Sequence, residues 1–458
     1  MKIKKLQLAF FTLISSYGLV HGQETKYYTL QECIRKAMTE NVSVLKAQLD
    51  EEEGKQKTKE VKATAFPQIN ATGELVDNVL RQAFVFPAAL GNPNAGPNDY
   101  IVLRGGLEYS TSVNVQVNQQ LFNQSLFTGI KAAKVSEDYY KLNREFTEEV
   151  IIYQVATLYY RVASLKTQKI VLQSNLDELQ KSLNITNERF DNGLARKLDV
   201  DRLRVSLTNI KTQLATIQDN YDVLISQLKL TIGLNKDYQF DIDFDLPANL
   251  DSAFFNYTPS VPETAWVWEN KIEYKQLYTQ LSLYKLERKN YSSGYFPTLS
   301  AFGSYTYQGQ SNSFFLSKDA NPLWFDVASI GLRLNLPIFD GFRKSAQMQQ
   351  SKLRQIKTEK DIAYVKQQSS TISENAIRSL EVNYKNFQDQ RLNVQLANSI
   401  YDVTEQNYKE GISPLTDLLQ AETSRIQAQS QLIEALLKVK QSEIDLLKAN
   451  GNIKSLLN

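Results

Sequence analysis

Apolar residues recur at three- and four-residue steps along two long stretches of the chain, from Ser125 to about Asn192 and from Gly341 to about Glu410. This spacing predicts amphipathic helices, and at ~1.5 Å per residue each would be on the order of 100 Å long. In the second stretch the apolar seam falls at strict seven-residue intervals, at Leu380, Phe387, Val394, Tyr401 and Tyr408. Helices of this length with such a seam are typical of coiled coils or helical tubes.

Four shorter segments alternate apolar and polar residues with a period of two, which predicts β-strands. They lie at about 67–82, 108–122, 297–309 and 325–338. The second is the clearest, because three valines alternate with amides: Val113, Val115 and Val117 with Asn114, Gln116 and Asn118. Residues 84–106 are rich in Gly, Pro and Asn, and we expect an exposed loop there. Each strand would therefore have one apolar and one polar face.

Each long helix leads into a short turn motif and then into another helix. The motifs are Arg189-Phe190-Asp191-Asn192-Gly193 with Asp199 six residues later, and Asn407-Tyr408-Lys409-Glu410-Gly411 with Asp417 six residues later. Glycine tolerates the left-handed conformation that ends a helix, so each motif predicts a helical hairpin; Pro414 suits the first turn of the helix that follows. A constant shift of 218 positions carries Phe190 to Tyr408 and Asp199 to Asp417. Because the whole order of elements occurs twice, we interpret the chain as an internal duplication.

The chain divides into five expected parts. Residues 1–22 combine three lysines with an apolar run, which is the pattern of a secretory signal peptide; a retained membrane anchor is the alternative. The other parts are a first repeat at 23–234, a connector at 235–262, a second repeat at 263–453 and a C-terminal tail at 454–458. The helical hairpins of the two repeats are expected at 125–232 and 341–448.

Composition argues against several function classes. The 458-residue chain has a net charge of +2, which falls near zero without the leader lysines, so no nucleic-acid-binding surface is indicated. The one histidine, His21, lies in the predicted leader, and the one cysteine is Cys33. A mature chain without histidine argues against His-based acid–base catalysis and His metal ligation. Since no nucleophile, paired-acid or phosphate-loop motif is visible either, we expect no enzyme activity, no cofactor and no metal site.

The strand pattern favours a β-barrel that spans a membrane. Each strand is roughly ten residues long, about the length that crosses a bilayer, and alternating apolar and polar residues are typical of such barrels. Four strands cannot close, and an open sheet edge is not tolerated in lipid. Several chains must therefore share one barrel. The alternative is a soluble four-stranded cap on an exported structural coiled-coil protein without channel activity.

The duplicated aromatic-x-x-Gly-x(5)-Asp hairpins resemble the TolC-like outer-membrane efflux protein family, the outer membrane factors of tripartite efflux and type I secretion systems. The same resemblance is carried by Phe66-Pro67 and Phe296-Pro297 at the strand entries and by Leu336-Pro337-Ile338-Phe339-Asp340-Gly341, and it covers about residues 27–453. It implies an internally duplicated α+β membrane protein. Four transmembrane strands from each of three identical chains would form a 12-stranded β-barrel in the outer membrane of a Gram-negative bacterium, continued by a long α-helical coiled-coil barrel in the periplasm.

The resemblance also implies a function, which is a passive exit duct gated at the periplasmic helical tip and opened by a periplasmic adaptor protein. An inner-membrane pump or ABC exporter would supply the energy, and outer-membrane lipid would surround the strands. A mixed belt built from the connector and the chain ends would lie partway along the helices. In the first repeat, Gln120-Leu121-Phe122-Asn123-Gln124 replaces the proline and the Asp-Gly of the second, so a less sharply turned junction is expected. The resemblance indicates neither the cargo nor whether the system performs efflux or secretion.

By the same resemblance, three copies of Asp417 ring the pore at the tip, where carboxylates favour cations and repel one another. Tyr408 and Asp199 are expected to join the inner and outer hairpins of the closed tip, because a phenol that donates to a carboxylate makes a charge-assisted bond. A solvated first-turn acid is the simpler reading of Asp417, and a seam position that of Tyr408. Ser413 stands where the family often has a basic residue and Gln420 where it often has a second acid, so we expect a weaker gate.

Two further surfaces are expected on the basis of the resemblance. The hairpin turns would contact the adaptor through Gly193, Leu194, Gly411 and Ile412, although the glycines serve the turns in any case. Aromatic residues near the outer ends of the strands would form a membrane-interface girdle, with packing inside the loops as the alternative: Tyr305, Tyr307, Trp324 and Phe325.

Overall fold

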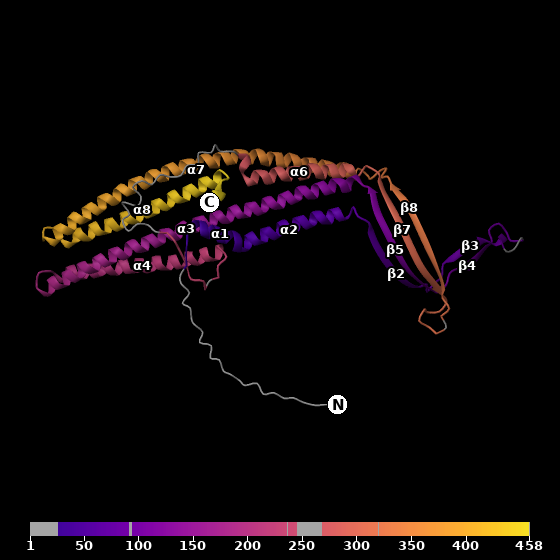
Figure 1. The fold of residues 1–458 in the computed structure, drawn as a ribbon, viewed down its shortest axis with the longest axis horizontal. Coiled ribbons are helices and arrows are strands. Elements are labelled where there is room, and N and C mark those ends of the chain that lie inside the picture. The colour runs from indigo at the N-terminus through magenta and orange to yellow at the C-terminus, as the bar shows by residue number, and fades with distance from the viewer. Residues whose placement is uncertain (1–25, 91–93, 236, 245–267, 319, 458) are drawn as a thin grey trace, which may run out of the picture.

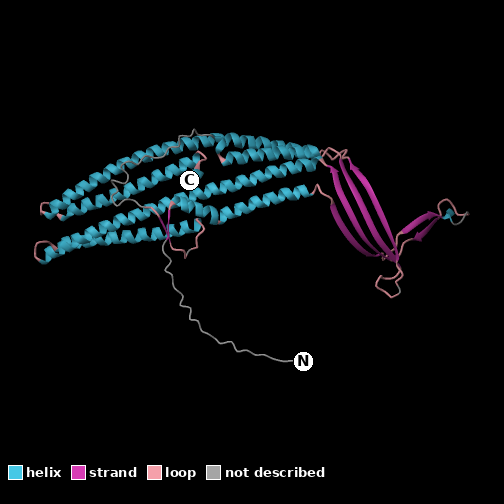
Figure 2. Ribbon diagram, in the orientation of Figure 1, coloured by secondary structure: helices cyan, strands magenta, loops and turns pink. Residues whose placement is uncertain are grey.

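A computed structural model describes residues 26–90, 94–235, 237–244, 268–318 and 320–457. The molecule is elongated, and a bundle of long helices leads at one end into a four-stranded sheet (Figures 1 and 2). The predicted signal peptide, with His21, lies outside the described residues, as does the part of the predicted connector after residue 244.

The elements follow one another in the order predicted for a duplicated chain. The helices are α1 Leu30–Glu40, α2 Val42–Ala63, α3 Gln124–Asp191, α4 Lys197–Thr231, α6 Ile272–Ser293, α7 Arg343–Lys409 and α8 Leu415–Ala449. The strands are β1 Lys26–Tyr28, β2 Gln68–Asp77, β3 Ala83–Pro87, β4 Tyr100–Arg104, β5 Tyr109–Phe122, β6 Phe240–Ile242, β7 Thr298–Ser311 and β8 Leu323–Asn335. Short 3-10 turns are η1 Ala88–Leu90, η2 Trp268–Asn270 and η3 Ile453–Leu457.

The two longest helices, α3 and α7, have 68 and 67 residues, which corresponds to roughly 100 Å each. Each folds back into a 35-residue helix, α4 or α8, and both turns lie at the end of the molecule farthest from the sheet (Figure 1). The seven-residue seam is confirmed, because Leu380, Phe387 and Val394 are buried in one apolar cluster and Tyr401 in the next, against which Tyr408 packs partly buried.

The main sheet is antiparallel in the order β2-β5-β7-β8, so its two repeats meet between β5 and β7. Its register places the apolar positions of neighbouring strands opposite one another: Val113 faces Gly73 and Tyr307, and Val115 faces Ala71 and Tyr305. The other face is polar, and there Asn114 Nδ2 donates to Thr306 Oγ1 at 2.6 Å. The outer strands β2 and β8 each pair on one side only within the described chain.

The expectation of a plain loop at 84–106 was wrong. β3 and β4 pair antiparallel and form a hairpin at the end of the sheet away from the helices (Figure 2). The two strands, Ala-Phe-Val-Phe-Pro and Tyr-Ile-Val-Leu-Arg, are rich in residues that favour β-structure. The Gly, Pro and Asn residues that suggested a loop belong mainly to the segment between them.

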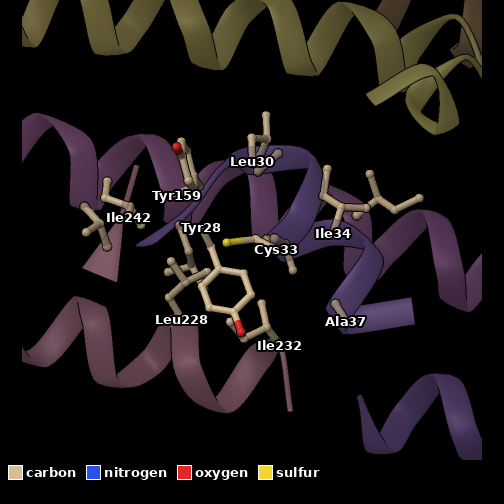
Figure 3. Packing of buried hydrophobic residues seen from close by; sticks show 14 of the residues in the cluster. Tyr28, Leu30, Cys33, Ile34, Ala37, Tyr159, Leu228, Ile232 and Ile242 are labelled. Carbon is tan, nitrogen blue, oxygen red and sulfur yellow. The ribbon is translucent and has the colours of Figure 1, made fainter. Parts of the chain in front are cut away.

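A mixed belt lies beside the middle of α3, where the resemblance placed it. β1 pairs in parallel with β6, and η3 from the C-terminus packs against α1 and α3. Thr29 is the N-cap of α1. Its hydroxyl accepts from Glu32 N, and its own backbone N donates to the Glu32 carboxylate, as a capping box requires. Around it a cluster of buried apolar side chains closes the belt (Figure 3): Tyr28, Leu30, Cys33, Ile34, Ala37, Tyr159, Leu228, Ile232 and Ile242.

The two strand-to-helix junctions differ in the expected direction. β5 passes directly into α3 through Asn123, whose side chain caps the helix by accepting from Leu126 N at 3.1 Å. β8 instead reaches α7 through residues 336–342, where Gly341 and Phe342 both have positive φ, of 65° and 64°. The left-handed pair turns the chain sharply, and only the second repeat has the Asp-Gly that favours it.

Candidate functional site

The two hairpin turns form one end of the molecule, which we call the tip: residues 192–196 between α3 and α4, and 410–414 between α7 and α8. Gly193 and Gly411 have φ of 73° and 79°, so the predicted left-handed ends of both long helices are confirmed. The following amides close the turns, since Leu194 N donates to Arg189 O at 2.7 Å and Ile412 N to Asn407 O at 2.9 Å. This is the Schellman arrangement that satisfies terminal carbonyls. Leu194 and Ile412 themselves are 79% and 70% exposed, so both are free to contact a partner.

Asp417 lies in the first turn of α8 and is exposed. Its carboxylate accepts only a long bond from Thr416 Oγ1, at 3.4 Å, and no ion pair involves it in the described part of the chain. Pro414 sits at the N-cap, one residue before the helix, rather than inside it as expected. Asp417 and Gln420 line a groove of about 550 Å³ between α7 and α8. A full negative charge in a first turn is favoured by the helix dipole and remains available to solvent ions.

Tyr408 and Asp199 lie at the tip but bind different partners. The Tyr408 hydroxyl is 3.3 Å from Thr186 Oγ1 on α3. Asp199 is 9% exposed, and its two oxygens accept from Arg196 Nε and Nη2 at 3.1 and 3.3 Å. The expected direct bond between Tyr408 and Asp199 is therefore not formed in this structure. Arg196, three residues before Asp199, donates to the carboxylate instead. The gating role of the two residues stays a prediction.

Sequence reasoning missed a polar cluster above the tip, which we call the Arg425 cluster: Asn175, Glu178, Tyr401, Arg425 and Gln429. Arg425 Nη2 donates to Glu178 Oε2 at 2.5 Å and to Asn175 Oδ1 at 3.0 Å. Its guanidinium carbon lies 3.7 Å from the centre of the Tyr401 ring, and Asn175 Nδ2 donates to Gln429 Oε1 at 3.1 Å. One feature of the sequence does mark this position. Arg425 stands within an apolar face of α8 whose members recur at steps of three and four residues: Leu418, Ala421, Ala428 and Leu432.

Glu422 lies one turn before Arg425 on α8 and is only 4% exposed. Burial raises the pKa of its carboxyl to about 7, although Arg425 pulls the pKa down, and the charge of Glu178 pushes it up. Its Oε1 has no hydrogen-bond partner among the described residues. A carboxyl in such a place is partly protonated near neutral pH.

At the opposite end, the sheet separates apolar from polar residues. The apolar face includes Tyr305 and Tyr307, and the Tyr307 ring stacks on Trp324 with centroids 4.9 Å apart. These rings are exposed, but Trp324 also contacts Phe315 of the neighbouring loop, with centroids 5.9 Å apart. Phe325 pairs with Gln308 on the polar face, so the girdle stays a prediction. Exposed aromatic rings at the ends of apolar strands suit a membrane interface.

Among the residues that the structure describes, no group of His, Cys, Asp and Glu could hold a metal ion. In the same residues, no helix combines the length and the apolar character that a membrane crossing needs.

Comparison with known proteins agrees with this geometry. The family model described as outer membrane efflux protein matches residues 33–234 and 282–452. The outer membrane protein TolC of Salmonella enteritidis is 20% identical over 462 residues, which cover 99% of this chain and 87% of that protein. The probable efflux pump outer membrane protein TtgC of Pseudomonas putida is 23% identical, with 92% and 82% covered.

Solved structures share the fold. The outer membrane protein VceC of Vibrio cholerae superposes with a TM-score of 0.68 at 14% identity, covering 92% of this chain and 96% of that one. The CmeC outer membrane channel of Campylobacter jejuni gives 0.67 at 14% identity, with 98% and 94% covered. The resemblance inferred from the hairpins is thus confirmed, and the alternative of an exported structural protein finds no support. The chain belongs to the outer membrane efflux protein family: it is an efflux channel of the Gram-negative outer membrane, with its helical part in the periplasm, and not an enzyme.

Proposed function

We propose that three copies of this chain form one passive exit duct through the outer membrane. The observation that carries the proposal is the four-stranded sheet, because β2 and β8 each leave one edge open. Open edges are not tolerated in lipid, so each β8 would pair with the β2 of the next copy. Two copies would give about eight strands, whose interior side chains fill, whereas three give about twelve and leave a lumen. The homotrimer is also what the family resemblance implies.

The two faces of the sheet support this arrangement. The apolar face, with Val113, Val115 and Tyr305, would contact outer-membrane lipid, and the polar face, with Asn114 and Thr306, would line a water-filled lumen. The stacked Tyr307 and Trp324 would then belong to the interfacial girdle. α3 and α7, with their partner helices, would continue the wall through the periplasm.

The tip would be the gate of this duct. Three exposed Asp417 carboxylates would ring the pore and favour cations. Tyr408, through Thr186, would help to hold the second hairpin against α3, and Asp199 would fix the first turn through Arg196. A periplasmic adaptor would contact Gly193, Leu194, Gly411 and Ile412, of which the two apolar side chains are the most exposed. Energy would come from an inner-membrane pump or ABC exporter, as the family resemblance implies.

The relatives favour efflux over protein secretion for this chain. Proteins 23% identical to it over 92% of its length are called antibiotic efflux pump and toluene efflux pump outer membrane proteins, both from Pseudomonas putida. Small organic molecules are therefore the cargo class that we propose. A lumen lined by neutral amides and hydroxyls, rather than by one sign of charge, is compatible with cargo of either charge.

Single-channel recording in a planar bilayer tests the proposal. We expect low conductance from the native protein, because the tip is closed without an adaptor. Tyr408→Phe combined with Asp199→Ala should raise the conductance, since the first change removes the bond to Thr186 and the second releases Arg196. Leu194→Ser is a matched control at the same turn that touches neither contact. Unchanged conductance in the double variant would contradict a gate at these residues.

A further inference from the structure

Near the tip, the ion pair of Arg425 with Glu178 is the one that joins the two hairpins among the described residues. Arg425 is buried and holds α8 to α3 through Glu178 and Asn175. Its Nε has no partner among the described residues, so these two side chains supply its hydrogen bonds. Separating the helices at this level would break the bonds of Arg425 to Asn175, which is buried, and to Glu178, whose side chain is 41% exposed. Hydrogen bonds of a charged group are worth more than those between neutral groups.

The polar contacts between the hairpins nearer the tip are weaker, although an apolar cluster that includes Leu183, Val200 and Leu418 also packs the hairpins together there. Tyr408 and Thr186 form one bond between neutral hydroxyls at 3.3 Å, and Arg189 donates one bond of 3.3 Å to the carbonyl of Lys409 in the exposed last turn. Bonds of this kind contribute about 1 kcal/mol or less each, because water replaces them when they open. The tip can therefore part without exposing a buried charge.

A cavity of about 360 Å³ separates these two levels. Glu178, Tyr401 and Arg425 line one part of it, while Tyr408 and Lys409 belong to the lining nearer the turn. This cavity is open to solvent along α3 and α7, so the two helices pack incompletely beside it, while the apolar cluster next to it stays packed. Fewer dispersion contacts resist separation along the open side.

The internal duplication shows that the cluster is a special feature of the second repeat. The shift of 218 positions relates Arg425 to Leu207 and Tyr401 to Leu183. Both leucines are buried in the apolar cluster near the tip. The second hairpin therefore has a buried arginine stacked on a tyrosine where the first hairpin has two leucines. The hydrogen-bond partners of this arginine, Glu178 and Asn175, belong to the first hairpin.

We propose that the Arg425 cluster is the fixed point about which the tip opens, and that Arg425 is its positioning residue. The proposal rests on the function proposed above, because it assumes that the hairpins part at the tip. From Glu178 to Asp191, the last residue of α3, the helix continues for roughly 20 Å. This segment and its counterpart on α7 would bend apart, while the hairpins stay joined at Arg425 and above it.

Thiol cross-linking at two levels tests the proposal in the full-length trimer carrying Tyr408→Phe and Asp199→Ala. One variant adds Asn175→Cys and Gln429→Cys, whose native side chains are 3.1 Å apart in the cluster. The other adds Arg189→Cys and Lys409→Cys at the tip. A short bis-maleimide bridges each pair, and Cys33 is buried and out of reach. We expect the cluster bridge to leave the raised conductance unchanged and the tip bridge to return it to the native value.

Three results would overturn the proposal, and they can be told apart. If the cluster bridge also lowers the conductance, the hairpins must part at Arg425. If the tip bridge leaves it high, the opening lies elsewhere. If the unbridged variant never conducts more than the native protein, the proposed gate itself is wrong and this inference falls with it.

A second set of variants separates positioning from folding. Arg425→Gln should raise the conductance of the native tip several-fold, and the Asn175–Gln429 bridge should restore the low value, because a covalent link replaces the lost fixed point. Arg425→Lys should lie between the two, since an ammonium can pair with Glu178 but has no planar face to stack on Tyr401. An Arg425→Gln channel that forms heat-sensitive trimers, conducts like the native protein and is unaffected by the bridge would contradict the proposal.

Discussion

The two hairpins share a turn motif but surround its aspartate in opposite ways. In the first, Asp199 is nearly buried and is held by a two-pronged contact from Arg196. In the second, Asp417 is exposed, and Pro414 occupies the position equivalent to Arg196. Proline sets the backbone for the helix start but brings no cation. Duplication has thus kept the turn while changing its electrostatics, so that one carboxylate is neutralised and the other is left as a free charge.

The same contrast extends two turns further along the helices. Leu183 and Leu207 in the first hairpin correspond to Tyr401 and Arg425 in the second, and the exposed Arg204 corresponds to the buried Glu422. The first hairpin is therefore stabilised near the tip mainly by apolar packing. The second carries buried ionisable groups that respond to pH and to the loss of a partner.

The largest expected effect separates the two aspartates. Asp417→Asn should weaken block of the channel by a trivalent cation about hundredfold, because in the proposed trimer it removes three carboxylates worth about 1 kcal/mol each in water. Asp199→Asn should leave the block almost unchanged, since that carboxylate is already paired with Arg196. Titration of single-channel current with the cation, in each single variant and relative to that variant's own unblocked current, measures both.

A converse substitution sharpens the same comparison. Pro414→Arg gives the second hairpin the cation that the first one has and should weaken the block about tenfold, the value of one charge-assisted bond. Equal sensitivity of the block to Asp199→Asn and Asp417→Asn would show that the two hairpins are not electrostatically different.

A smaller effect concerns Glu422 and the pH dependence of stability. Because burial raises the pKa of its carboxyl to about 7, its contribution to stability is complete below the unfolded pKa near 4.5 and is lost as the pH rises through about 7. The groups that act on it are Arg425 beside it on α8, Glu178 on α3, and Tyr401 on α7, whose own pKa burial raises to about 12. The loss amounts to on the order of 2–3 kcal/mol per chain.

Thermal unfolding of the purified protein at pH 5 and pH 8 measures this effect. Glu422→Gln should reduce the drop in unfolding temperature between the two pH values, whereas Arg204→Gln, at the equivalent exposed position, should leave the drop unchanged. The belt contains another carboxyl with a pKa raised to about 7 by burial, that of Glu149, so part of the drop should remain in the Glu422 variant. An identical drop in the native protein and Glu422→Gln would contradict the assignment.

The regular elements could be predicted from the sequence because their periodicity is strong and local. α3 begins one residue before the expected start, and β5 and β7 match the alternating segments to within about two residues. The glycine ends of the hairpins could be predicted for the same reason, since Gly193 and Gly411 act through the backbone alone. The β3–β4 hairpin was missed because its short strands lie among turn-forming residues.

The partners of the tip residues could be predicted less well, because most of them lie far apart in the sequence. Arg196 and Asp199 are three residues apart, so their pairing is a local contact that the sequence does indicate and that competes with a bond from Tyr408 to Asp199. Arg425 differs from its repeat equivalent Leu207, which marks the position as unusual. Its partner Glu178 lies 247 positions away, and no local pattern connects the two.

The proposed duct requires that three chains share one barrel. The mass of the intact complex tests this requirement directly. Native mass spectrometry of the purified protein, released from detergent micelles, should show a complex with the mass of three mature chains. Heating that unfolds the sheet should separate this complex into single chains. A complex of two chains would leave about eight strands and no open lumen, and a monomer would leave the edges of β2 and β8 unpaired. Either result would contradict the proposed duct.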